Sequence, residues 1–120
     1  SLPVYFRSTI QGDLKGQMRR HERSIRFNIG EGSGKHRPGG KAERFRTARG
    51  SANECATALD EVKVFGLADR QTTLEALHLV HRIISMLTKL ILYWESVAAK
   101  EDAVPRRMRK DSRRLPESEP

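Results

Sequence analysis

The stretch from Arg70 to Ala98 carries apolar residues at seven-residue spacing, and it restricts the fold more than any other part of the chain. The repeats are Leu77, Ile84 and Ile91; Val80, Leu87 and Trp94; and Ile83, Leu90 and Val97. Residues seven apart lie on nearly the same side of an α-helix, because seven residues make about two turns. Together the three rows cover about half of the helix circumference, whereas packing on one core needs roughly 100°. The sequence therefore predicts a long helix with more apolar surface than one core can cover.

A large apolar surface outside the core usually marks an interface. We therefore expect a homo-oligomer packed through this helix, which Asp69 is placed to cap. The residues predicted to form the interface are Val80, Ile83, Leu87, Leu90 and Trp94. The alternative is a helix buried centrally within one subunit.

Two further helices are predicted upstream. An apolar stripe formed by Leu14, Met18, His21, Ile25 and Ile29 indicates a helix from Leu14 to about Glu31, with Asp13 as its N-cap. A second apolar face indicates a helix from about Lys41 to Val64, ended by Gly66.

Between these two helices lies a glycine-rich basic loop, Gly32 to Gly40. It is not a nucleotide-binding P-loop, because Ile29 and His36 stand where that motif needs Gly and Ser or Thr.

Three segments of the chain resemble a known family. They are Gln17-Met18-Arg19-Arg20 continuing through Ser24-Ile25 to Asn28-Ile29-Gly30-Glu31-Gly32; Phe45-Arg46 with Ala48-Arg49-Gly50-Ser51 and Glu54; and Leu59 to Leu67. They are similar to the signature of the four helix bundle protein family, also called the 23S ribosomal RNA intervening-sequence proteins. The resemblance implies an all-α, antiparallel up-down-up-down four-helix bundle and a homopentameric ring. It also implies a fold-level relation to the accessory variability determinant of diversity-generating retroelements, a basic pentamer that works with a reverse transcriptase.

Under this resemblance, Ser1 to Gly12 represents a shortened first helix. We expect one bundle domain over residues 1–99, followed by a charged, disordered tail over residues 100–120, where the apolar pattern stops.

Positive charge is concentrated in one part of the chain. The net charge is +8, yet Asp13 to Arg49 holds eleven Lys and Arg residues against four acidic ones. A lopsided basic surface is expected of a nucleic-acid binder, although a solvated surface with no such role is the competing interpretation. The residues predicted to contact RNA or DNA phosphates, largely without reading sequence, are Arg19, Arg23, Arg26, Lys35, Arg37, Lys41, Arg44, Arg46 and Arg49. An alternative function is a protein-interaction scaffold that docks a partner such as a reverse transcriptase.

The sequence offers no set of residues for catalysis. No paired carboxylates, catalytic triad or cofactor loop can be assembled, so we expect no enzyme activity and no cofactor. His78 and His81 lack a further ligand of metal-binding spacing, so we expect no metal site.

The single Cys55 cannot form an internal disulfide, no apolar run is long enough to span a bilayer, and no signal peptide is visible. A cytoplasmic protein without a membrane partner is the expectation.

Overall fold

The computed structural model describes residues 3–108, apart from the side chains of Tyr5 and Phe6. These residues form three long helices and no strand: α1 (Val4–Ser33), α2 (Pro38–Phe65) and α3 (Arg70–Ala103). A short 3₁₀ turn, η1 (Arg106–Met108), follows α3. The predicted all-α class is confirmed.

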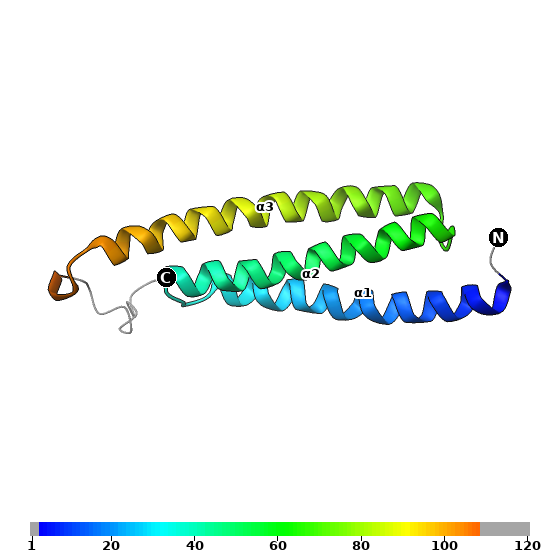
Figure 1. The fold of residues 1–120 in the computed structure, drawn as a ribbon, viewed down its shortest axis with the longest axis horizontal. Coiled ribbons are helices and arrows are strands. Elements are labelled where there is room, and N and C mark those ends of the chain that lie inside the picture. Colours follow the sequence, from blue (N-terminus) through cyan, green and yellow to red (C-terminus); the bar gives the residue numbers. More distant parts are fainter. Residues whose placement is uncertain (1–2, 109–120) are drawn as a thin grey trace.

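The three helices run antiparallel in a rod of 67 × 23 × 21 Å (Figure 1). α2 lies between its two neighbours and packs against both, as Figure 1 shows. No Cα atom of α1 comes within 8 Å of one in α3 among the described residues. The backbones of the two outer helices therefore stay apart, and only their longer side chains meet.

The fourth helix expected from the sequence is not present in residues 3–108. The described part of the predicted first helix, residues 3–12, is not separate from the next one, because α1 starts at Val4 and continues through Asp13, which consequently caps no helix. The first turns are held by the α2–α3 turn: Arg7 donates to the carbonyl of Gly66 over 2.9 Å, and Gln11 donates to that of Leu67 over 2.7 Å. These tertiary contacts stabilise a continuous helix despite the helix-weakening glycines in it.

The helix ends agree with the sequence in part. Asp69 caps α3, accepting a hydrogen bond from the backbone N–H of Thr72 at 2.9 Å, and Gly66 ends α2 in the left-handed conformation with φ of 62°. The glycine loop is shorter than predicted, since α1 runs to Ser33 and Pro38 already occupies the first turn of α2. α3 extends to Ala103, past its expected end near Ala98. The predicted tail lies mostly in residues 109–120, outside the described part.

The core is built on the small residues of α2. Ala48 and Ala52 are fully buried, so α2 can approach both neighbours closely. One cluster joins Ile25 of α1 to Leu77 and Val80 of α3 through the buried face of α2. A second cluster forms around Phe45, Ala48, Leu87 and Ile91. The core of this rod is thus one side of each outer helix packed on α2.

Candidate interaction surfaces

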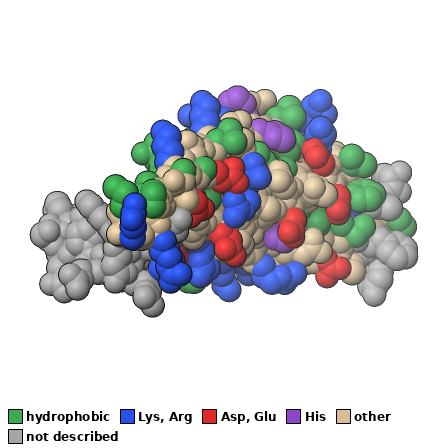
Figure 2. Space-filling view, turned by 60° about the vertical axis from the view of Figure 1, so that its left-hand side comes forward, with side chains coloured by type: hydrophobic (Ala, Val, Ile, Leu, Met, Phe, Trp, Pro, Cys, Tyr) green, Lys and Arg blue, Asp and Glu red, His purple; other side chains and the backbone are tan. Residues whose placement is uncertain are grey.

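The outer face of α1 carries exposed cations that point away from the core. Arg19, Arg23 and Arg26 are exposed, and at 100° per residue they lie opposite the buried Leu14 and Ile25. Arg26 pairs with Glu22 one turn earlier at 2.7 Å. Arg19 and Arg23 make no hydrogen bond or ion pair with the described residues. Lys and Arg side chains gather along the lower edge of Figure 2, the side on which α1 lies in Figure 1.

The turn between α1 and α2 adds a second group of cations. Lys35 and Arg37 are exposed and unpaired within the described part of the chain. Arg44 lines a polar cavity of about 300 Å³ together with His36 and Thr47. His36 also faces Glu31 across the turn, with 3.8 Å between Nε2 and Oε1. These groups are accessible at one end of the rod.

The remaining three cations of the predicted set are engaged within the fold. The Lys41 ammonium donates to the carbonyl oxygens of Gly32 and Gly34, at 3.0 and 2.6 Å, and lies 5.0 Å from the centroid of the Trp94 ring. Arg46 pairs with Glu95 at 2.7 Å, and Arg49 donates to the hydroxyl of Thr88 at 3.3 Å.

Lys41 neutralises the carbonyl end of α1, while Arg46 and Arg49 link α2 to α3. The nine residues thus divide into an accessible set on α1 and the turn, and a structural set between helices. The nine residues are close together in the sequence. The sequence does not show which of them form ion pairs or hydrogen bonds with groups elsewhere in the chain.

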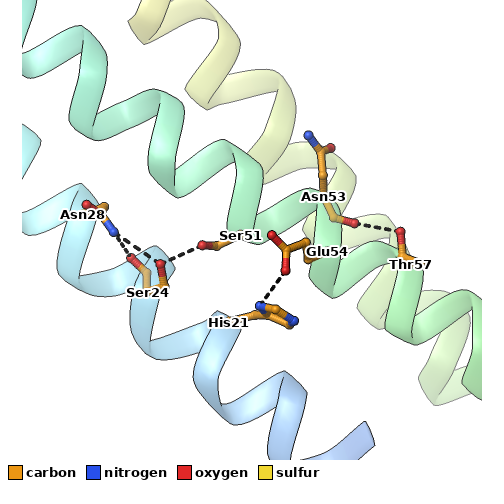
Figure 3. Close-up of polar contacts among 7 residues, drawn as sticks. All are labelled: His21, Ser24, Asn28, Ser51, Asn53, Glu54 and Thr57. Atoms are coloured by element: carbon orange, nitrogen blue, oxygen red, sulfur yellow. Dashed lines mark hydrogen bonds and ion pairs between the residues drawn. The ribbon is translucent and has the colours of Figure 1, made fainter.

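A polar cluster lies at the interface of α1 and α2 (Figure 3). The hydroxyls of Ser24 and Ser51 are 2.6 Å apart, and Asn28 donates to the carbonyl and the hydroxyl of Ser24 at 2.8 and 3.3 Å. Nearby, His21 faces Glu54 with 3.5 Å between Nδ1 and Oε2. No buried side-chain N or O atom among the described residues lacks a partner, and the Ser24–Ser51 and His21–Glu54 contacts join α1 to α2.

α3 presents a second apolar row that the subunit covers only in part. Two residues of the predicted interface, Val80 and Leu87, are packed in the core with 9% and 2% exposure. Ile83 and Trp94 are half-buried and pack against the core, and Leu90 is exposed. The partly covered row, here called the outer seam, consists of the exposed Leu79, Met86, Leu90 and Tyr93 and the half-buried Ile83 and Val97.

The spacing along the outer seam alternates between four and three residues, which is the pattern of a helix-pairing surface. The seven-residue repeats in the sequence include some of these positions. The structure is needed to distinguish the outer seam from the row that packs on α2, which includes Val80, Leu87 and Ile91.

By length and composition alone, α3 is apolar enough to cross a membrane. One 18-residue window has a mean hydropathy of 1.3, with 22% of it buried in the subunit. Core helices of soluble proteins pass the same test. The exposed apolar residues of α3 include members of the outer seam and also Leu74 and Leu92, and α3 carries a polar stripe as well.

Groups that could support chemistry are sparse. Residues 3–108 hold no cluster of three or more His, Cys, Asp or Glu side chains suited to a metal ion. Cys55 is buried, and this burial, followed by the nearby charge of Glu22, raises the pKa of its thiol.

These features define a class of protein: a basic, antiparallel helical rod with exposed cationic and apolar surfaces. The chain belongs to the 23S rRNA-intervening sequence protein family, whose model matches residues 3–89. The match spans α1, α2 and the first part of α3. No curated protein and no solved structure matches the chain.

Proposed function

We propose that this protein is a non-catalytic module that binds RNA or DNA through the outer face of α1 and the turn that follows it. The observation that carries the proposal is the set of unpaired cations Arg19, Arg23, Lys35 and Arg37. Cations that form no ion pair within the subunit are free to displace the counterions of a phosphate backbone, which is a main source of affinity for nucleic acids. Phosphate contacts of this kind carry no sequence information.

RNA is the first nucleic acid to test, because the family name refers to 23S rRNA intervening sequences. Arg26 and Arg44 belong to the same accessible set, since Arg26 is highly exposed even in its ion pair and Arg44 lines an open cavity. Lys41, Arg46 and Arg49 contribute to binding indirectly, by holding the helices in place.

The test is charge reversal on the outer face of α1. Arg23→Glu should weaken binding to RNAs of different sequence by a similar factor and should lower the slope of log affinity against log salt by about one. Arg82→Glu is the matched control, because Arg82 is exposed on the polar stripe of α3 and the change in net charge is identical. Equal losses for the two variants, or no binding of the unchanged protein at low salt, would contradict the proposal.

The outer seam supports a second role, homo-oligomerisation through α3. α2 leaves most of the outer seam exposed, and a row with this spacing can pack into the holes of a facing helix. We propose a ring of subunits, a pentamer by family resemblance, in which a neighbouring helix supplies the fourth member of each bundle. Sedimentation equilibrium of the purified protein tests this, and a stable monomer over a wide concentration range would contradict it.

The same assembly can act as a scaffold for a protein such as a reverse transcriptase, the function that the fold-level relation suggests. We favour nucleic-acid binding because the described residues show the unpaired cations directly. A protein complex that survives nuclease treatment would favour the scaffold.

We further propose that the protein acts in the cytoplasm, without a metal or cofactor and without a membrane partner.

A further inference from the structure

Phe27 is an apolar side chain in the middle of the basic face of α1. It is 61% exposed, whereas Leu14 and Ile25 of the same helix are buried. Single exposed apolar residues are common on protein surfaces, so exposure alone assigns no role. The surroundings of Phe27 are what distinguish it.

Two arginines precede Phe27 on the same face of α1. Arg23 is one turn before it and Arg20 is two turns before it, and residues four and seven apart share a face of the helix. Helical side chains lean toward the N-terminus, so the Phe27 ring extends over the turn that contains Arg23. Arg20, Arg23 and the exposed Phe27 therefore share one face of α1.

Gly30 follows Phe27 by three residues, so no side chain from position 30 covers the ring, and a Cβ atom built there would meet nothing within 4 Å. Glu31, four residues after Phe27, faces His36 across the turn, with 3.8 Å between the two side chains. A flat ligand can lie against Phe27 while its charged neighbour contacts Arg23.

We propose that Phe27 stacks on an unpaired base and that the outer face of α1 binds single-stranded nucleic acid. The inference deepens the nucleic-acid binding proposed above and depends on it. Stacking on an exposed aromatic needs a base face that a duplex keeps covered, whereas arginines contact phosphates of either form. Charge complementarity favours a polyanion over a second copy of this chain, because two such basic faces repel each other.

The test compares Phe27→Leu with the unchanged full-length protein, using fluorescence anisotropy with a labelled oligouridylate strand and a duplex of equal length. Stacking of one base is worth about 1–3 kcal/mol, so single-strand affinity should fall about 5- to 150-fold. Duplex affinity and the salt slope should stay the same, since no charge is removed. Phe27→Tyr should retain single-strand binding.

Val64→Ala is the control for loss of an exposed apolar side chain, because Val64 is 75% exposed on α2. It should leave both affinities unchanged. Circular dichroism should show intact helices in each variant, since neither residue is buried.

Three outcomes would overturn the proposal. An unchanged single-strand affinity in Phe27→Leu, while Arg23→Glu still weakens binding, would remove stacking and leave the proposed function standing. A smaller sedimentation mass for Phe27→Leu without nucleic acid would assign the residue to self-association. Failure of the unchanged protein to bind either nucleic acid would overturn the proposed function as well.

Discussion

Gly32 of α1 faces the ring of Phe45 in α2 so closely that a Cβ atom on Gly32 would lie 2.8 Å from Cε1 of that ring. Phe45 is buried, so the ring has little room to move away. The last turn of α1 therefore packs on α2 through its backbone. This contact gives a structural reason for a glycine near the end of the Asn28–Gly32 signature.

Substitution of Gly32 should destabilise the protein, whereas substitution of Gly30 should not. Gly32→Ala should cost about 1–3 kcal/mol of unfolding free energy, because it overpacks the core at Phe45. Gly30→Ala should stabilise by about 0.5–1 kcal/mol, because Gly30 lies in an open helical position. Urea denaturation of both variants measures the difference, and equal effects would show that the helix end is not packed as described.

The Ser24–Ser51 hydrogen bond should appear as coupling between α1 and α2. A double-mutant cycle with Ser24→Ala and Ser51→Ala should give an interaction energy of about 0.5–1.5 kcal/mol, because each hydroxyl is part-buried against the other. Thr57→Ala is the control in α2: its exposed hydroxyl bonds only the carbonyl of Asn53 in the same helix (Figure 3). Additive effects of the two serine substitutions would contradict the contact.

Removal of the Lys41 charge should loosen the junction of the three helices. Lys41→Met keeps the length of the side chain but removes the ammonium that donates to the carbonyls of Gly32 and Gly34; Gly34 keeps only the backbone N–H of His36 as a donor. We expect a loss of about 1.5–3 kcal/mol, the range for hydrogen bonds to charged groups. Lys35→Met, at an exposed position, should change the unfolding free energy little.

A charge placed in the outer seam should break the assembly without unfolding the subunit. Met86 is 59% exposed in the monomer, so Met86→Glu should leave helicity intact while reducing the mass measured by light scattering. Ser85→Glu places the same charge on the polar stripe of α3 and should leave the mass unchanged. The outer seam is not the interface if both variants keep the mass of the unchanged protein.

The Cys55 thiol should react only at alkaline pH in the folded protein. Its pKa is raised by burial first and by Glu22 second, so the thiolate that reacts with iodoacetamide forms at higher pH than in the unfolded chain. A raised folded pKa also means that the contribution of Cys55 to stability is complete below the unfolded pKa and is lost as pH rises through the folded pKa. Labelling rates measured against pH, with and without denaturant, test the shift.

The local chemistry of the helix ends could be predicted from the sequence. Asp69 and Gly66 act through hydrogen bonds and backbone conformations within a few residues, so the chain itself carries the information. The start of α1 could not be predicted in this way. Asp13 has the chemistry of a cap, but contacts from the distant Gly66 and Leu67 keep the helix intact around it.

The candidate surfaces were predictable as regions but not as residues. The excess of positive charge around α1 and the wide apolar surface of α3 are visible in the sequence. Whether a given side chain is free depends on partners far along the chain, such as Glu95 for Arg46. Periodicity likewise assigned Leu87 to an apolar surface without showing that α2 covers it.

The position of α2 between its neighbours has a consequence for how the chain folds. The backbone of each helix approaches only the helix before or after it in sequence, and most close residue pairs lie within one helix. Topologies of this kind have low contact order, and we expect the subunit to fold in microseconds to milliseconds. Two hairpins that share one helix can form in either order, and α3 can detach while α1 and α2 stay paired.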